Sequence, residues 1–329
     1  MPTLTLDEKE TNTAPDRSAP TRRNRSRWRH LLEYVAVAVL FALLRGLPRP
    51  VARAVGAALA LAIYWLHGRW RRIGAFNLRL AFPGRSRGER RRILRQAFRR
   101  WGWLLAEFAR FPRHTAETIQ QVIEYDGLEN YQQAAARGKG VLYLTAHIGA
   151  WELSSFSHSV NGFPLAYLNR PLDNPLVDAL VKRYRGAAGN RPIDRRNAAR
   201  AVLEELRRGG VVGILMDQNV LEGDTNVFVD FFGMPASTSA GLARFALRTG
   251  AAVVPGFVLW DENRKKYRLR FDPALELVRT GDQERDVVEN TARFTKVIES
   301  YIRRYPDQWL WIHRRWRTRP RGLPSLYPE

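Results

Sequence analysis

His147 is the residue of this sequence most suited to acid–base chemistry. It follows the apolar run 141–145 and lies five residues before Glu152. Such a run predicts a buried strand, and ligands of open α/β sheets gather at the carboxyl ends of the strands. Gly149 lets the backbone bend between the two residues, which would not share a face of one helix. We expect the carboxylate to bind one ring nitrogen, so that the other can accept a hydroxyl proton.

This spacing is weak evidence by itself. Six histidines and 32 acidic residues produce it easily by chance. The alternative is a structural histidine at a strand end. The position of His147 between a strand and a helix favours the general base.

The residues that the chain lacks exclude several other chemistries. There is no cysteine, which excludes disulfides, thiolate nucleophiles, cysteine zinc sites and iron–sulfur clusters. The phosphate-loop, nucleophile-elbow, zincin and dinucleotide-binding motifs are missing as well. We therefore expect neither a metal nor a cofactor.

Beyond residue 121, short β-rich runs alternate with helical stretches. The expected strands are 122–125, 141–145, 165–168, 211–216, 227–231, 252–259 and 267–271. The expected helices are 128–137, 151–160, 175–185, 197–208, 237–248 and 282–304. Alternation of this kind requires crossover connections. It predicts an α/β fold with a mostly parallel central sheet flanked by helices.

The N-terminal region is of a different character. Residues 1–27 are polar and predict a disordered tail, and an arginine cluster leads into the apolar runs 31–44 and 51–66. These runs form a shallow membrane hairpin, or the first one spans, or both are a buried helical pair. Membrane association is favoured. We therefore divide the chain into the tail, a membrane-anchoring segment 28–68, a catalytic domain 69–320 and a C-terminal tail 321–329.

The charge balance points to an anionic partner. Lysine and arginine number 54 against 32 acidic residues, a formal net charge of +22. Nucleic acid, an acidic protein and an anionic membrane surface would each be attracted to such a basic protein. An arginine-rich composition also arises from a GC-rich genome, so the charge cannot choose among these partners.

The chain resembles the bacterial late acyltransferases of lipid A synthesis, the lauroyl and myristoyl transferases, within the wider glycerolipid acyltransferase group. The resemblance covers nearly the whole chain, although the long N-terminal tail and the paired apolar runs depart from it. The matching segments occur in the family's order after the apolar anchor: 77–83, 145–152, 169–175, 216–218, 231–235, 249–255 and 306–320.

The resemblance implies an acyltransferase fold in which His147 is the base and Glu152 orients it. The acceptor hydroxyl would attack an acyl thioester of acyl-carrier protein or coenzyme A and expel a thiolate. The acceptor would be an anionic glycolipid or phospholipid, most simply a lipid A precursor. The enzyme would then work at the cytoplasmic side of the cell inner membrane, and the positive charge would attract the acidic carrier and lipid phosphates.

Further site residues follow from strand ends and from the resemblance. Asp217 is expected to be catalytic, with a helix cap or an arginine partner as the alternative. His313 is interpreted as a phosphate or membrane contact, and Trp309 as core packing. The candidate substrate-binding residues are Asn169, Arg170, Arg195, Gln218 and Gly233.

Two other functions stay open. The same dyad would serve acylation of a phosphatidylinositol mannoside or a lysophospholipid. A basic nucleic-acid-binding protein without catalysis would explain the charge and the tryptophans. It would not explain the apolar N-terminus or the ordered family segments, so we expect no nucleic acid partner.

Overall fold

The structure is a computed structural model that describes residues 26–194, 198–223 and 225–327. Nearly all of the expected tail 1–27 therefore lies outside the described residues. The same holds for Arg195, one of the candidate substrate-binding residues.

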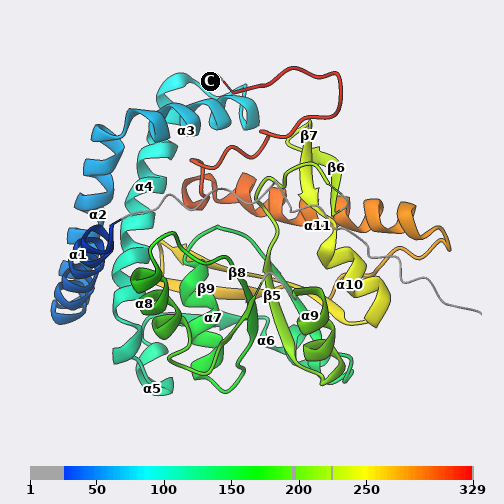
Figure 1. Ribbon diagram of the computed structural model, residues 1–329, viewed down its shortest axis with the longest axis horizontal. Helices are drawn as coiled ribbons and strands as arrows, with labels where there is room; N and C mark the ends of the chain where they lie inside the picture. Colours follow the sequence, from blue (N-terminus) through cyan, green and yellow to red (C-terminus); the bar gives the residue numbers. More distant parts are fainter. Residues whose placement is uncertain (1–25, 195–197, 224, 328–329) are drawn as a thin grey trace, which may run out of the picture.

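The described residues build a seven-stranded sheet in the order β1-β9-β8-β2-β5-β3-β4, beside a separate hairpin of β6 and β7 (Figure 1). The strands are β1 Ile123–Asp126, β2 Val141–Thr145, β3 Ala166–Asn169, β4 Arg191–Asp194, β5 Val211–Leu215, β6 Asn226–Phe231, β7 Met234–Ser239, β8 Ala252–Asp261 and β9 Lys266–Phe271. Within the seven-stranded sheet, strands β8, β2, β5, β3 and β4 run parallel, β1 pairs parallel with β9, and only the β8–β9 pairing is antiparallel. The expected α/β fold with a mostly parallel sheet is confirmed.

Helices cover both faces of this sheet. They are α1 Arg27–Gly46, α2 Arg49–Leu66, α3 Gly68–Ala81, α4 Arg87–Ala109, α5 Ala116–Ile119, α6 Leu128–Ala135, α7 Trp151–Val160, α8 Pro175–Arg185, α9 Ala198–Arg207, α10 Gly241–Thr249 and α11 Gln283–Arg304. Alternate side chains of β2 explain the two layers, because successive residues of a strand point to opposite faces. Leu142 and Leu144 join a core with α9, α10 and α11, whereas Val141 and Tyr143 join a core with α6, α7 and α8.

The expected helix 237–248 is wrong at its start. Residues 237–239 belong to β7, which pairs with β6, and helix α10 begins only at Gly241. The hairpin turn holds Phe232 and Gly233 at positive φ, a conformation that glycine adopts readily. Serine and threonine at 237–239 suit a strand as well as a helix start, so periodicity alone did not separate the two.

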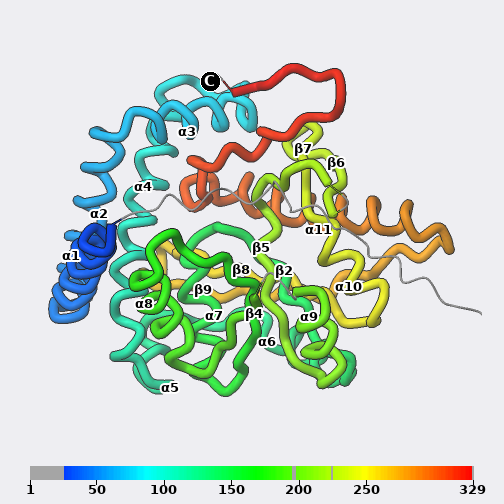
Figure 2. Tube along the Cα trace, in the orientation of Figure 1, coloured from blue at the N-terminus to red at the C-terminus, as the bar shows by residue number. Residues whose placement is uncertain are grey.

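Four N-terminal helices form one flank of the molecule (Figures 1 and 2). Helix α2 packs along α4, where a Cβ on Gly56 would lie 2.2 Å from the carbonyl oxygen of Gly102. Only glycine at this crossing allows the two backbones to approach so closely. Helix α2 is thereby fixed to α4 by one face, while its other face stays exposed.

The C-terminal segment after α11 returns over the molecule to α3 (Figure 2). The Asn77 side chain on α3 donates to the carbonyl oxygens of Trp311 at 2.6 Å and His313 at 2.7 Å. The hydroxyl of Tyr327 in turn donates to the Asn77 side-chain oxygen at 2.6 Å. This segment is thus tied to the N-terminal helices, and it reaches the candidate site described below.

His158 on α7 is fully buried among aromatic rings. The rings of Tyr131, Phe163 and Phe271 have their centroids 4.4, 5.0 and 5.2 Å from the imidazole. Burial lowers the His158 pKa to about 3, because the apolar surroundings disfavour the charged ring.

This burial predicts a pH-dependent stability. The unfolded chain binds a proton on His158 near the ordinary histidine pKa, whereas the folded chain does not until about pH 3. Stability is therefore complete above the unfolded value and falls as the pH decreases toward 3. His158→Phe should remove about 2 kcal/mol of the stability loss between pH 7 and pH 5. Urea unfolding at both pH values measures it.

The exposed His67 supplies the comparison for this measurement. His67→Asn keeps a side-chain acceptor for the α3 N-terminus and shows how much of the change follows from replacing a histidine outside the aromatic core. Equal pH slopes for the wild type and His158→Phe would contradict the prediction.

Candidate active site

Parallel pairing of β2 with β5 brings His147 and Asp217 together. Thr145 and Leu215 are the last paired residues of the two strands, and His147 and Asp217 each follow two positions later. The ladder continues past the strands, since the Met216 N–H donates to the Thr145 carbonyl at 3.1 Å. Equal offsets from a common register therefore place the imidazole beside the carboxylate, at the carboxyl edge where such folds bind ligands.

The Asp217 carboxylate receives three hydrogen bonds from the residues around it. His147 donates from Nδ1 to Oδ1 at 2.8 Å and from its backbone N–H to Oδ2 at 3.1 Å. The Trp309 indole donates to Oδ2 at 2.7 Å. The side chain of Asp217 is only 2% exposed, against 21% for His147. The acid is thus sealed in the protein and the imidazole reaches outward.

These bonds fix how the imidazole can react. A carboxylate only accepts hydrogen bonds, so Nδ1 carries the proton and Nε2 keeps a lone pair. The Gln218 side-chain nitrogen lies 3.3 Å from Nε2. A substrate hydroxyl that replaces this amide would donate to Nε2, which is the geometry of a general base.

The carboxylate stays ionised despite its burial. Burial alone would raise the Asp217 pKa, but the attraction to His147 and the hydrogen bonds from His147 and Trp309 outweigh it and lower the pKa to about 2. Donors directed at a charged group stabilise that form. At neutral pH Asp217 is therefore an anion able to stabilise a protonated imidazole.

The expected contact between Glu152 and His147 is wrong. Glu152 on α7 instead binds Arg185 on α8, with Nε to Oε2 at 2.8 Å and Nη2 to Oε1 at 2.5 Å. The physical reason is that Glu152 lies in the first turn of α7, which packs against α8, while Asp217 already occupies the Nδ1 side of the ring. Arg185 also donates to the Asn169 side-chain oxygen at 3.3 Å.

A cavity of about 300 Å³ opens beside the imidazole. It runs between α7 and the ends of β2, β5 and β3. Its wall includes His147, Trp151, Glu152, Arg170, Arg185 and Gln218, and its inner part includes Tyr143, Leu165, Gly213 and Ile214. The cavity therefore has charged donors at one end and mainly apolar walls at the other.

The candidate substrate residues divide into two groups. Arg170 and Gln218 line the cavity. Asn169 does not, but its side-chain oxygen accepts a hydrogen bond from Arg185, which does. Gly233 lies apart from it in the β6–β7 turn, where its N–H donates to Asp230. The structure thus places Gly233 in a turn, which was the alternative, and its role in substrate binding stays a prediction.

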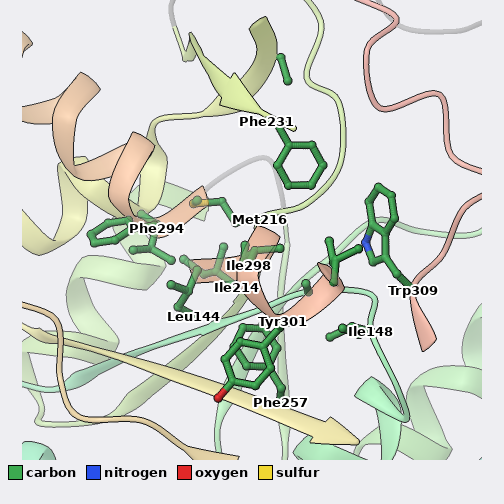
Figure 3. Close-up of a cluster of buried hydrophobic side chains, with 14 of the residues drawn as sticks. Leu144, Ile148, Ile214, Met216, Phe231, Phe257, Phe294, Ile298, Tyr301 and Trp309 are labelled. Atoms are coloured by element: carbon green, nitrogen blue, oxygen red, sulfur yellow. The ribbon is translucent and has the colours of Figure 1, made fainter. Parts of the chain in front are cut away.

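The sequence did not reveal the contacts that three residues make in or around the site. Trp309 is buried as expected, beside Phe231 and Ile148 (Figure 3), yet its indole also orients Asp217. Arg185 had no recognisable signal, since its partner is 33 residues away. His313 was interpreted as a phosphate or membrane contact, and in the structure its Nε2 accepts the Asn219 N–H at 2.8 Å. Burial lowers the His313 pKa to about 4.

The loop that carries His147 is held by the same C-terminal segment. The Leu310 N–H donates to the His147 carbonyl at 3.1 Å, and the Gly149 N–H donates to the Gln308 carbonyl at 2.7 Å. Gly149 has φ +60°, and a Cβ there would lie 1.8 Å from the Val258 carbonyl oxygen. Glycine is thus required to turn the chain from β2 into α7.

Known proteins are similar in sequence to this chain over most of its length. The family model described as bacterial lipid A biosynthesis acyltransferase matches residues 22–318. The chain belongs to this family. A lauroyltransferase of lipid A biosynthesis from Escherichia coli is 30% identical over 301 residues, which are 91% of this chain and 95% of that protein. A palmitoleoyltransferase of the same organism is 28% identical over 302 residues, with the same coverage. A lipid A biosynthesis acyltransferase of Haemophilus influenzae is 29% identical over 75% of each chain.

Because it belongs to this family, the protein is an acyltransferase. This activity requires both a cavity and polar side chains beside it. Acyl transfer to a hydroxyl needs a base at the oxygen and space for a long apolar chain. His147 and the cavity supply candidates for both. The needs of acyl transfer thus agree with the geometry of the candidate site.

The geometry predicts different effects for the two acids. Asp217→Asn removes the anion that holds Nδ1–H, and kcat should fall by about 10²- to 10⁴-fold, the usual contribution of a general base. Glu152→Gln breaks only the ion pair with Arg185, so its larger effect should be on KM. Steady-state kinetics of acyl transfer would measure both. A large kcat loss in Glu152→Gln with a nearly normal Asp217→Asn would contradict the assignment.

Proposed function

We propose that this acyltransferase moves a fatty acyl group from a thioester, on acyl-carrier protein or coenzyme A, to a hydroxyl of a lipid A precursor. The observation that carries the proposal is the His147–Asp217 pair at the wall of a partly apolar cavity. The names of the relatives, which act in lipid A biosynthesis, support this acceptor class.

The reaction needs one base and one good leaving group. His147 Nε2 removes the hydroxyl proton while the oxygen attacks the thioester carbonyl carbon. A carbon–oxygen bond forms and the carbonyl oxygen becomes negative. Collapse of this intermediate breaks the carbon–sulfur bond, and the proton on His147 passes to the departing thiolate. Asp217 stabilises the imidazolium between the two proton transfers.

Two guanidinium groups of the cavity wall are placed to bind anions. Arg170 is exposed at the mouth, and Arg185 is held inside by Glu152 and Asn169. Guanidinium forms paired hydrogen bonds with phosphate oxygens. We assign Arg170 to a phosphate of either substrate. Glu152 then acts on Arg185, as a positioning residue rather than as a partner of the base.

A mass-spectrometric assay tests the reaction and its acceptor. Purified enzyme, acyl-carrier protein thioesters of graded length and a lipid A precursor should give a product with one more acyl group. His147→Ala should abolish the product, and circular dichroism should show that the variant still folds, although the loss of a partner for the buried Asp217 lowers its thermal stability. Parallel reactions offer a phosphatidylinositol mannoside and a lysophospholipid. Acylation of one of these alone would replace the acceptor, and full activity in His147→Ala would contradict the mechanism.

The N-terminal helices present an exposed apolar face that we call the apolar stripe. Its residues are Trp28, Leu31, Leu32, Val35, Val39 and Leu43 on α1, and Val51, Val55, Leu59, Ile63 and Leu66 on α2. Repeats of four residues keep such side chains on one face of a helix. Among the described residues, α2 is the one helix long and apolar enough to cross a membrane. Its opposite face is fixed to α4 at Gly56, which favours docking in the plane of the membrane.

Polar and aromatic groups around the stripe support the same docking. Trp65 and Trp70 are exposed at the end of α2 and the start of α3, and Arg91 lies 5.6 Å from the Trp65 ring. Tryptophan and arginine are common at lipid headgroups. Helix α1 also lies close to the chain at the cavity mouth, because Asn174, two residues after the lining residue Leu172, donates to the His30 carbonyl and to Glu33 of α1. An acceptor in the lipid layer would thus meet Arg170 and then His147.

Vesicle binding tests the apolar stripe. Val35→Glu combined with Leu59→Glu places two charges in the stripe and should reduce sedimentation with anionic phospholipid vesicles at least tenfold, since each buried charge opposes insertion. Val288→Glu is the matched control, because Val288 is a similarly exposed apolar residue on α11. Equal binding of the double variant and the control would contradict docking through the stripe.

A further inference from the structure

Arg315 is a completely buried cation behind the catalytic pair. It lies in the C-terminal segment, is 0% exposed, and its guanidinium carbon is 5.0 Å from the Phe231 ring centroid. Among the described residues, no carboxylate lies within ion-pair distance of it. A charge buried in this way is costly unless other groups compensate it. The groups around Arg315 must therefore compensate its buried charge.

Hydrogen bonds join Arg315 to the loop after β5. Nη1 donates to the Ser237 carbonyl at 2.5 Å and to the Gln218 carbonyl at 3.4 Å, and Nη2 donates to the Thr238 hydroxyl at 2.5 Å. Gln218 directly follows Asp217 in the chain. The guanidinium thus connects β7 to the backbone that presents the catalytic carboxylate.

Electrostatics relate the same two groups. Burial lowers the Arg315 pKa to about 10, and attraction to Asp217, followed by Tyr327, opposes this decrease. Even so, the guanidinium stays charged at neutral pH. For the Asp217 pKa itself, burial raises the value, and the attraction to His147 with the hydrogen bonds from His147 and Trp309 lowers it. Arg315 adds a fixed positive charge behind them.

We propose that Arg315 is a positioning residue for catalysis, which holds the Asp217 loop through Gln218 and supplies the positive charge that keeps the His147–Asp217 pair from taking up a proton too readily. The proposal rests on the proposed function of this pair. It gives the C-terminal segment a part in the reaction beyond packing. Trp309 orients the carboxylate from one side, and Arg315 fixes its loop from the other.

The other ionisable groups around the pair do not replace this charge. His313, also in the C-terminal segment, is neutral at pH 7 because burial lowers its pKa to about 4. Tyr327 faces Arg315, and burial raises its pKa, so it is uncharged. Strand β7 offers only the Ser237 carbonyl and the Thr238 hydroxyl. Arg315 is therefore the cation whose removal should change the titration of the pair.

The test is the pH profile of kcat/KM for acyl transfer. Arg315→Gln keeps a donor for the Ser237 carbonyl and removes the charge. The acidic limb should then move to higher pH by about half a unit or more, because a lost cation makes protonation of the pair easier. Arg315→Lys keeps the charge and loses the fork of donors. Its acidic limb should stay within 0.2 unit, about the error of such a profile, while kcat falls.

Arg319→Gln is the matched control. Arg319 lies in the same segment and donates to the Pro235 carbonyl of β7 at 3.1 Å, so its loss affects packing without affecting the pair. An unmoved acidic limb in a folded Arg315→Gln, or an equal shift in Arg319→Gln, overturns the proposal. If Arg315→Gln does not fold, the kcat and the acidic limb of Arg315→Lys test the proposal. At least a tenfold kcat loss with an unmoved limb supports positioning, and a wild-type kcat overturns it. Wild-type enzyme without acyl transfer would instead contradict the proposed function.

Discussion

The hydrogen bond from His147 to Asp217 is the constraint around which the site is organised. It joins two loops that leave neighbouring parallel strands at the same level, so the register of β2 and β5 fixes its length. The buried Asp217 accepts three hydrogen bonds, whereas His147 is partly exposed at the cavity. Such a pair keeps one nitrogen protonated and leaves the other able to accept a proton.

The C-terminal segment contributes as much to this geometry as the sheet does. Gln308 and Leu310 fix the His147 loop by backbone hydrogen bonds, and Trp309 between them binds Asp217. Asn77 ties the following residues to α3. Helix α3 in turn contacts α2, which carries the apolar stripe together with α1. One continuous set of contacts thus joins the face proposed to meet lipid to the base proposed to act on it.

Much of this architecture was predictable from the sequence because it depends on local patterns. The apolar run before His147 and its counterpart before Asp217 marked two strand ends, and alternation with helices indicated a parallel sheet. Strand β4 was missed because it is a short edge strand with Pro192, a residue that cannot donate to a ladder. The start of α10 was misplaced because 237–239 pair with a strand that periodicity does not reveal.

The partners of the charged residues could not be predicted in the same way. Glu152 was assigned to His147 from its spacing, its place between a strand and a helix, and the family resemblance, yet the packing of α8 against α7 gives it Arg185. Asp217 was predicted to be catalytic, but its contact with His147 depends on the order of strands in the sheet, which no local pattern records. Arg315 and Trp309 reach the site from nearly a hundred residues away. Side-chain partners of this kind follow from tertiary packing.

The most direct measurement of the central claim is nitrogen NMR of the enzyme with ¹⁵N-labelled histidine, with His147→Gln used to assign the signal. The account predicts that the neutral form of this imidazole carries its proton on Nδ1, hydrogen-bonded to Asp217, and that its Nε2 is unprotonated. A neutral His147 ring that carries its proton on Nε2 instead would contradict it.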